Sequence, residues 1–542
     1  VVIGPTTRLL IGDLFELVNI GAHALKGFAA PIQLWRVQRE GKAESRFEAL
    51  HGASLTPLVG REHEVGLLLE RFQRARDGEG QVVLLSGEPG IGKSRLIGAL
   101  RERLRSQPYM LLSHFCSPFH VNSAFQPVIG MLERTARFER DEPPTYLVAK
   151  LEALLAFAGV SSADAVALLA ALLSIPVSPR EPQPALGPDV QKRCTLELLV
   201  DLVAGLTARQ PVLAVYEDLH WVDPSTLELL GQIVERIEHL PILCILSFRP
   251  GFTPPWPPHG HIAPLPLGRL GRRQGASMIE VIAGGRSLPP ELMDQIAAKT
   301  DGVPLFLEEL TKSLLESGQL QERGGRYELA GALPSLTIPS TLQDSLVARL
   351  DRLGAAKETM QLGSALGREF GHDLLAAVSP LRERELRAAL AQIVATGLLI
   401  QRGSPPDLAY SFQHALVQDA AYAGLLKRRR QEIHSRIAQV LIERFPARVA
   451  AQPELLAHHH TEAGEVEAAA DRWLEAGRRS TERSANAEAV AHLKHGLEII
   501  KALPAGSARD CRELDLLVAL GVPLIATKGY GAPEIDEIYS RA

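Results

Sequence analysis

An eight-residue run rich in glycine separates an apolar segment from a helical pattern early in this chain. The run is Gly87-Glu88-Pro89-Gly90-Ile91-Gly92-Lys93-Ser94. The apolar residues 82–86 before it predict a buried strand, and the amphipathic residues 93–104 predict a helix. Glycine adopts positive φ angles without a steric penalty. The three glycines therefore predict a tight strand-to-helix turn with an accessible backbone.

The same run matches the GxxxxGK[ST] pattern of phosphate-binding loops without a mismatch. In such a loop backbone N–H groups surround phosphates, and the helix N-terminus adds positive potential. We expect the Lys93 ammonium to contact the outer phosphates and the Ser94 hydroxyl to coordinate magnesium. The predicted cofactors are ATP or ADP with Mg²⁺. The predicted binding residues here are Gly87, Glu88, Pro89, Gly90, Ile91, Gly92, Lys93, Ser94 and Arg95.

Further apolar segments alternate with helical patterns. Residues 109–115, 212–216 and 242–247 predict strands, and residues 226–237 predict a helix between the last two. This alternation predicts an α/β fold with a doubly wound parallel sheet. The proline-rich stretches 175–188 and 252–261 predict exposed loops.

Two acids follow the predicted strand 212–216, and an arginine follows the next strand. Carboxyl ends of parallel strands face the ligand in doubly wound sheets. We assign Glu217 to the metal and Asp218 to activation of the attacking water, although a shift of one residue would exchange these roles. Arg249 is predicted to sense the γ-phosphate. These three residues are the predicted catalytic set, and Ser94 and Glu217 are the predicted metal ligands.

Composition excludes several other classes of protein. The chain has 58 basic and 63 acidic residues, which argues against general nucleic-acid binding. The longest apolar run, residues 165–175, is well short of the ~18 residues that a membrane span needs. The four cysteines are far apart and predict neither disulfides nor a zinc site. His458-His459-His460 lacks metal-ligand spacing, and the basic run 427–430 predicts a solvated helix face.

Beyond Gly268 the chain becomes mostly helical. Helices are predicted at residues 271–283, 289–299 and 304–317. Residues 338–401 predict short helices and a strand at 398–400 that pairs with residues 409–412, an arrangement similar to a winged helix. The Ala-rich paired helices beyond Pro453 suggest a helical-repeat array.

Five segments in a fixed order resemble the signal-transduction ATPases with numerous domains (STAND), within the AAA-like P-loop proteins. They are Leu58-Val59-Gly60-Arg61-Glu62, the glycine loop, Glu217-Asp218-Leu219-His220-Trp221, Ser247-Phe248-Arg249 and Gly302-Val303-Pro304-Leu305-Phe306. The resemblance covers residues 55–445 and implies a regulatory nucleotide switch. It places Val59, Gly60 and Arg61 near the adenine and Pro304 over the base.

The resemblance also bears on hydrolysis. It implies that His414 reaches the β-phosphate of ADP, the alternative being a histidine satisfied inside the core. Glu217 stands where these ATPases commonly carry Asp. We therefore expect slow or regulated hydrolysis, at most a weak ATPase.

The two ends resemble other modules. Gly12-Asp13-Leu14-Phe15-Glu16-Leu17, Leu25-Lys26-Gly27-Phe28 and Pro31-Ile32-Gln33-Leu34-Trp35-Arg36-Val37 resemble the closing part of class III adenylate/guanylate cyclase domains. This implies that Lys26 once contacted substrate phosphates. The aspartates that bind metal in cyclases lie upstream of such a segment, so we expect no cyclase activity from this chain. Trp473 and Ala487-Glu488-Ala489 resemble tetratricopeptide repeats.

Six regions are predicted. They are a cyclase remnant (1–40), a linker (41–54), the ATPase core (55–267), a helical lid (268–335), a winged-helix-like module (336–445) and truncated tetratricopeptide-like repeats (446–542). The chain begins without Met and ends inside a helical pattern, so we expect both ends to be cuts through a longer protein.

The leading hypothesis is a cytoplasmic bacterial ATP-binding regulator from a cyclase-linked protein, with a protein or small-molecule signal read by the repeats. No membrane contact and no direct nucleic-acid contact are expected, and a nucleotide-dependent oligomer is left open. Two alternatives remain at this point. One is a nucleotide cyclase whose catalytic half is missing, and the other is a LuxR-like transcription regulator without its DNA-binding domain.

Overall fold

The computed structural model describes most of the chain. The described residues are 2–3, 15–23, 32–40, 58–138, 142–161, 164–176, 187–257, 259–316, 320–323, 326–329, 341–402 and 408–542. Lys26, the predicted linker 41–54 and most of the predicted loop 175–188 lie outside these ranges.

A parallel five-stranded sheet with the order β5-β6-β7-β4-β8 lies at the centre. Its strands are β4 (Gln81–Gly87), β5 (Met110–Phe115), β6 (Val212–Glu217), β7 (Ile242–Phe248) and β8 (Ile262–Leu267). All neighbouring pairs are parallel, so the carboxyl ends of β4, β6 and β7 meet at one edge. The predicted α/β fold and four of its strands are confirmed.

Strand β8 was not predicted from the sequence, because Pro264 and Pro266 interrupt it. Both prolines are exposed, whereas Ala263, Leu265 and Leu267 are buried. β8 pairs only with β4 and forms an edge of this sheet, where a missing backbone N–H removes no ladder hydrogen bond. Proline is therefore compatible with a strand at this position.

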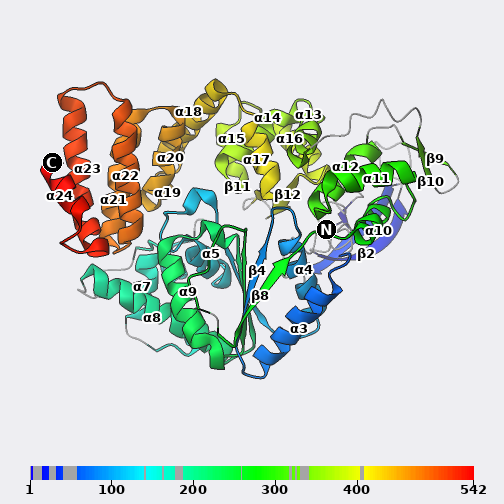
Figure 1. Ribbon diagram of the computed structural model, residues 1–542, viewed down its shortest axis with the longest axis horizontal. Helices are drawn as coiled ribbons and strands as arrows, with labels where there is room; N and C mark the ends of the chain where they lie inside the picture. Colours follow the sequence, from blue (N-terminus) through cyan, green and yellow to red (C-terminus); the bar gives the residue numbers. More distant parts are fainter. Residues whose placement is uncertain are drawn as a thin grey trace.

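Helices cover both faces of the sheet (Figure 1). The helices of the core are α3 (Glu62–Arg76), α4 (Lys93–Leu104), α5 (Gln126–Thr135), α6 (Pro144–Ala158), α7 (Ala165–Leu172), α8 (Pro188–Thr207) and α9 (Pro224–Arg236). α3 and α4 pack on alternate strand residues such as Leu213 and Ile245. Helices α5 to α9 pack on the opposite set, which includes Ala214 and Cys244. β7 is consequently buried along its whole length.

The next helices form a separate small core beside the sheet. They are α10 (Arg272–Ile282), α11 (Pro290–Thr300) and α12 (Pro304–Glu316), followed by the hairpin of β9 (Leu320–Arg323) and β10 (Arg326–Leu329). Leu292, Ile296 and Leu310 are fully buried in this core. The three predicted helices are confirmed to within one residue at each end. We call α10–α12 the lid.

The third unit is helical with a three-stranded sheet. It contains α13 (Leu342–Asp351), α14 (Ala356–Leu366), β11 (Glu369–Gly371), α15 (His372–Val378), α16 (Glu383–Ala395), β12 (Leu399–Arg402), β13 (Ala409–Phe412), α17 (Ala415–Ala423) and α18 (Lys427–Arg444). β12 pairs antiparallel with β13, as predicted. β11 adds a strand on the other side of β13 that the sequence did not reveal. A buried ion pair between Arg349 and Glu309 joins this unit to the lid.

The C-terminal region is entirely helical among its described residues. Its helices are α19 (Pro446–Ala451), α20 (Pro453–Ala463), α21 (Val466–Glu482), α22 (Asn486–Ile499), α23 (Ser507–Lys528) and α24 (Pro533–Arg541). Helices α20 to α24 each pack on the next. The packing of α21 on α22 is close, because a Cβ at Gly477 would lie 2.4 Å from Leu493. These helices lie beside α7 and α9 of the core (Figure 1).

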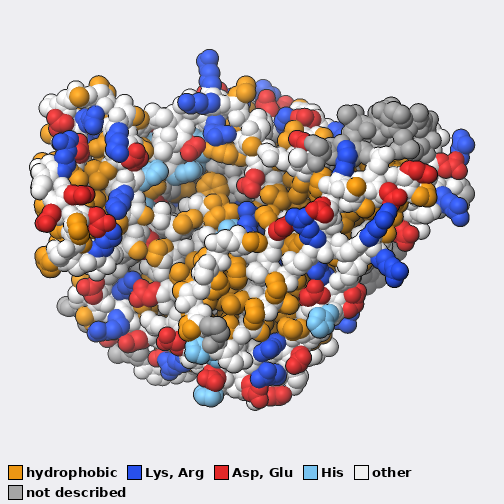
Figure 2. Space-filling view, viewed as in Figure 1, with side chains coloured by type: hydrophobic (Ala, Val, Ile, Leu, Met, Phe, Trp, Pro, Cys, Tyr) orange, Lys and Arg blue, Asp and Glu red, His pale blue; other side chains and the backbone are white. Residues whose placement is uncertain are grey.

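The N-terminal strands β1 (Val2–Ile3), β2 (Phe15–His23) and β3 (Ile32–Glu40) form an antiparallel sheet with the order β1-β3-β2. The strand predicted at residues 32–37 is part of β3. In Figure 2 hydrophobic side chains gather on the middle of the visible face, and charged side chains dominate its periphery. Among the described helices, none is both long and apolar enough to cross a membrane.

Candidate nucleotide-binding site

The glycine-rich loop joins β4 to α4, as its sequence predicts. Gly90 and Gly92 have φ angles of +77° and +102°, which side-chain-bearing residues rarely adopt. Gly92 caps α4 without any side-chain hydrogen bond. The first N–H groups of an α-helix have no acceptor inside the helix. This helix start therefore offers backbone donors and the positive end of its dipole to an anion.

Lys93 is the first residue of α4 and is buried, with 9% of its surface exposed. Its Nζ donates hydrogen bonds to the carbonyl oxygens of Gly87 (2.7 Å) and Glu88 (3.1 Å). Burial lowers the pKa of Lys93 to about 8, with Asp218 and Glu217 raising it and Arg249 lowering it further. An anion beside Nζ would favour the charged ammonium, because opposite charges raise a lysine pKa.

The two predicted metal ligands lie together. Ser94 Oγ donates a hydrogen bond of 2.5 Å to Glu217 Oε2, which brings α4 to the carboxyl end of β6. Asp218 follows in the left-handed region with φ +58°, and its N–H donates to Ser247 Oγ at 3.2 Å. A hydroxyl and a carboxylate are oxygen ligands that Mg²⁺ accepts, so Ser94 and Glu217 fit the predicted ion.

Arg249 follows β7 at the same edge of the sheet. Its guanidinium lies over the Trp221 ring, 4.7 Å from the ring centre. The His220 ring lies beside that tryptophan, with 4.2 Å between ring centres. Burial lowers the pKa of His220 to about 4, and the cations Arg249, Lys93 and Arg368 act in the same direction against Asp218. The neutral His220 and Trp221 thus support the Arg249 side chain.

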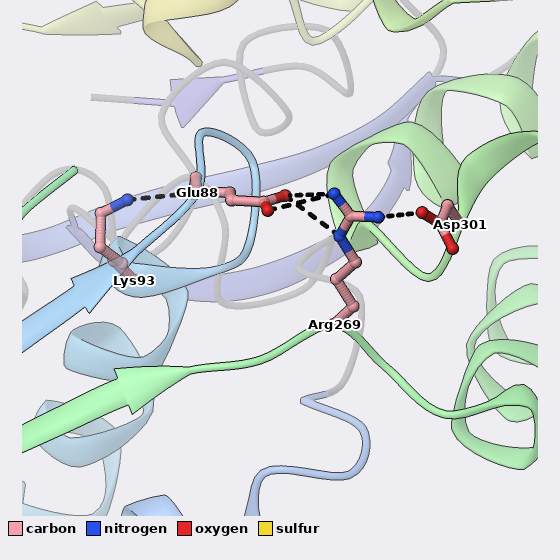
Figure 3. A network of polar contacts seen from close by, with 4 residues as sticks. All are labelled: Glu88, Lys93, Arg269 and Asp301. Atoms are coloured by element: carbon pink, nitrogen blue, oxygen red, sulfur yellow. Dashed lines mark hydrogen bonds and ion pairs between the residues drawn. The ribbon is translucent and has the colours of Figure 1, made fainter. Parts of the chain in front are cut away.

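Glu88 directs its carboxylate toward the lid (Figure 3). Arg269 donates three hydrogen bonds to this carboxylate at 3.0–3.2 Å, and it also pairs with Asp301 at the end of α11. Glu88 therefore contacts Lys93 through its carbonyl, while its side chain ties the loop to the lid. No local motif indicates this pairing, because Arg269 lies 181 residues further along the chain.

The lid also contacts the loop through its backbone. The N–H of Leu305 donates to the carbonyl of Gly90 at 3.1 Å, where α12 begins with Pro304. A Cβ at Gly90 would lie 3.0 Å from Leu305 Cβ. Backbone of the glycine loop and backbone of the lid thus approach each other closely.

The residues predicted near the adenine stand at the junction of core and lid. Arg61 is 7% exposed, pairs with Glu64 at 2.9 Å and donates to the carbonyl of Gly268 at 2.5 Å. Gln274 of α10 donates to the carbonyl of Gly60 at 3.2 Å. Val59 packs against the hydrophobic core of the lid.

The third unit contributes a cation that sequence reasoning missed. Arg368 lies directly before β11, and its Nη1 is 2.5 Å from Asp218 Oδ2. The two side chains are 26% and 16% exposed. Arg368 is 150 residues from Asp218 and belongs to no motif, so proximity in the fold is its only signal.

One cleft with a volume of about 2190 Å³ connects these elements. It lies between the sheet edge, the lid and the third unit. Fourteen of the predicted site residues line it: Val59, Arg61, Pro89, Gly90, Ile91, Gly92, Lys93, Ser94, Arg95, Glu217, Asp218, Arg249, Pro304 and His414. Gly60, Gly87 and Glu88 are not among its lining residues. Arg368 lines the cleft as well, and His414 does so as the residue before α17.

The parallel sheet, the glycine loop and the acidic end of β6 together define a P-loop ATPase core. Comparison with known families agrees, because residues 57–246 match the family model described as the AAA ATPase domain. This part of the chain is thus similar to AAA-type ATPase domains. A protein of Rhizobium meliloti (strain 1021), described as uncharacterized, is 29% identical over 546 residues and matches 100% of this chain. The chain spans about half of that relative, 52% of its length.

Several solved structures are similar to this chain at low sequence identity. One is a STAND protein with a tetratricopeptide repeat sensor from Pyrococcus horikoshii, at 11% identity and a TM-score of 0.43, covering 90% of this chain and 65% of that one. Another is the Orc1 protein of Aeropyrum pernix in complex with DNA, at 15% identity and 0.32, covering 70% and 97%. A third is the RuvB Holliday junction branch migration motor of Thermotoga maritima, at 15% and 0.27, covering 65% and 91%.

Proposed function

We propose that this chain is a regulatory switch that binds ATP or ADP with Mg²⁺ in the cleft and signals through the position of the lid, the third unit and the repeats. Phosphates would lie at the start of α4 on Lys93, with Ser94 and Glu217 holding the metal. The bound metal would neutralise phosphate charge. Val59, Gly60 and Arg61 would lie at the base, and Pro304 would close over it.

The observation that carries this proposal is the ion pair between Asp218 and Arg368. Asp218 is the residue we assign to activation of water, and Arg368 arrives from a unit that follows the ATPase core in sequence. A carboxylate oxygen that accepts a hydrogen bond from a guanidinium is less available to contact the attacking water. The position of the third unit therefore bears on how fast ATP is hydrolysed.

Two further contacts extend the coupling to the lid. Arg269 joins the Glu88 carboxylate to Asp301, and Leu305 N–H meets the Gly90 carbonyl. The buried pair of Arg349 and Glu309 then connects the lid to the third unit. A nucleotide that changes the conformation of the glycine loop would therefore shift the lid and the third unit through these contacts. Exchange of nucleotide, more than turnover, would set the state of such a switch.

Binding is tested by calorimetric titration of ATP and ADP with Mg²⁺ into the wild type and into Lys93→Ala. We expect the variant to lose ATP affinity by roughly 10- to 150-fold, because a hydrogen bond to a charged group contributes about 1.5–3 kcal/mol. Lys501→Ala serves as a matched control, since Lys501 is exposed beyond α22 and pairs only locally with Glu498. Equal nucleotide affinity in wild type and Lys93→Ala would contradict the proposed site.

A further inference from the structure

A second, smaller cavity lies between the ATPase core and the helical repeats. Its volume is about 320 Å³, or roughly ten water molecules at ~30 Å³ each. The core contributes residues of the segment before α5, of α5 itself and of the end of α7. The repeats contribute residues of α19, α20 and α21. The size falls at the lower end of the range found for small-molecule sites, about 300–1,000 Å³.

Three arginines face this cavity. Arg479 lies in the last turn of α21 and Arg483 caps the end of this helix, and both donate to the single hydroxyl of Ser174, at 3.4 Å and 2.9 Å. Arg448 of α19 lines the cavity as well. Among the described residues, no carboxylate lies within 4.0 Å of the Arg479 or Arg483 guanidinium. Like charges four residues apart repel each other, and the negative end of the α21 dipole offsets part of this repulsion.

Two acids also line the cavity, Glu454 and Glu133, and Glu454 lies within electrostatic reach of Arg479 and Arg483. Glu454 is held by the core, because Ser123 Oγ donates to its Oε1 at 2.8 Å. Burial raises the pKa of Glu454 and also that of Glu133, the other acid in the wall. His120 is neutral at physiological pH, because burial lowers its pKa to about 4. Desolvation and the neighbouring charge of Arg479 lower the pKa of Arg483, whereas the carboxylates of Glu454 and Glu482 raise it.

We propose that this cavity binds a small anion with phosphate or carboxylate groups, which Arg479 and Arg483 contact from the repeats and Ser174 contacts from the core. Guanidinium groups recognise both kinds of oxyanion through paired hydrogen bonds. The anion would bridge two units that otherwise meet here through contacts such as Gln452 Nε2 to Gln126 Oε1 at 2.8 Å. The volume admits a metabolite of a few carbons and excludes a nucleoside triphosphate.

The cavity adjoins the large cleft. His120 and Arg448 line both spaces, so the same side chains separate the anion from the far end of the nucleotide cleft. The anion would serve as an input signal to the switch, a role that rests on the proposed function. By linkage, an anion that changes nucleotide affinity must have its own affinity changed by the same factor.

The test is a calorimetric titration of inorganic phosphate and of succinate into the Lys93→Ala chain. This variant is used because anion binding at its glycine loop is weakened. The same titrations are made after adding Arg479→Gln and Arg483→Gln together. Arg478→Gln is the matched control, because Arg478 is an exposed neighbour on the same helix. Far-ultraviolet circular dichroism and thermal unfolding establish that each variant is folded.

We expect at least one of the two anions to bind the Lys93→Ala chain and its Arg478→Gln derivative equally. We expect its affinity to fall at least tenfold in the chain with both glutamines. The absence of heat with both anions, or equal affinity with and without Arg479 and Arg483, would overturn the proposal. A nucleotide titration of the Arg479→Gln/Arg483→Gln variant with Lys93 intact distinguishes the two proposals. This variant should still bind ATP or ADP, because both substitutions lie outside the nucleotide cleft.

Discussion

The acidic end of β6 shows how far individual residues can be interpreted. Ser94 and Glu217 are predicted as metal ligands from two motifs, and their side chains are hydrogen-bonded in the structure. Such residues are found from sequence because each sits at a fixed offset from a strand or helix end. Arg368 and Arg269 follow no such offset and reach the site only through the fold. The sequence therefore predicted the groups that would touch nucleotide, and missed the cations that connect them to other units.

The role of Glu217 can be tested directly. We expect Glu217→Gln to weaken the Mg²⁺ dependence of ATP binding, because an amide is a poorer ligand for a hard cation than a carboxylate. The measurement is ATP affinity across a magnesium titration in wild type and variant. If the dependence is unchanged in Glu217→Gln but weakened in Asp218→Asn, the metal role moves to Asp218.

The role of Arg368 predicts a gain of activity. We expect Arg368→Ala to hydrolyse ATP several-fold faster than the wild type, because the Asp218 carboxylate is released from its ion pair and can contact the attacking water. Steady-state phosphate release at saturating ATP is the measurement. Arg387→Ala is the control, since Arg387 forms an exposed pair with Glu383 on the same unit. An unchanged or lower rate of ATP hydrolysis in Arg368→Ala would contradict the proposal that Arg368 restrains Asp218.

Among the elements, helix α9 connects the site to the repeats. It follows the acidic end of β6, and its own N-cap, Asp223, accepts a hydrogen bond from Thr226 N–H at 2.8 Å. A second acid, Glu488 of α22, accepts one from Ser225 N–H at 2.9 Å, although it lies 263 residues away. The helix predicted at residues 226–237 begins two residues earlier in the structure, and neither cap was part of the prediction. Strand β8 and the short strand β11 were missed for local reasons, namely prolines and a length of three residues.

Asp223 gives this junction a pH dependence. Burial raises the pKa of Asp223 from 3.8 to about 7, with Glu488 acting in the same direction against the hydrogen bonds from Thr226 and Phe125. The folded chain thus binds this proton more tightly than the unfolded chain. The contribution of Asp223 to the free energy of unfolding consequently falls as the pH rises from about 4 to about 7.

We expect Asp223→Asn to reduce that loss, because the amide keeps an oxygen for the N–H groups of Thr226 and Phe125 without carrying a charge. Relative to the wild type, the variant should gain about 3 kcal/mol of stability between pH 4.5 and pH 8. Urea unfolding at the two pH values is the measurement. Asp201→Asn, at an exposed ion pair with Arg236, should show no such change. Parallel pH profiles for wild type and Asp223→Asn would contradict this account.

At the scale of the whole molecule, contacts between units far apart in sequence surround the nucleotide cleft. The α/β core with its helical C-terminal region was predicted, because the motifs and periodicities are local. How the units sit on one another was not, since it depends on pairs such as Ser123 with Glu454. The boundaries of the six predicted regions remain predictions. So do the cyclase linkage and the alternative of a transcription regulator.

The N-terminal strands are relevant to whether this chain has nucleotide cyclase activity. β1, β2 and β3 form a small antiparallel sheet, and the paired aspartates of a cyclase are not expected in this segment. We expect no cyclic AMP when the purified chain is incubated with ATP and Mg²⁺ or Mn²⁺. Product analysis by mass spectrometry is the measurement, and detectable cyclic AMP that disappears on heat denaturation would refute this expectation.

The contact of Leu305 with Gly90 has a consequence for how such a molecule could be controlled. The loop that would grip the phosphates is also the anchor of the lid, through this backbone bond and through Glu88 with Arg269. Release of the nucleotide and opening of the lid would then occur together. Any partner that pulls α12 away from the sheet would act as an exchange factor without touching the nucleotide at all.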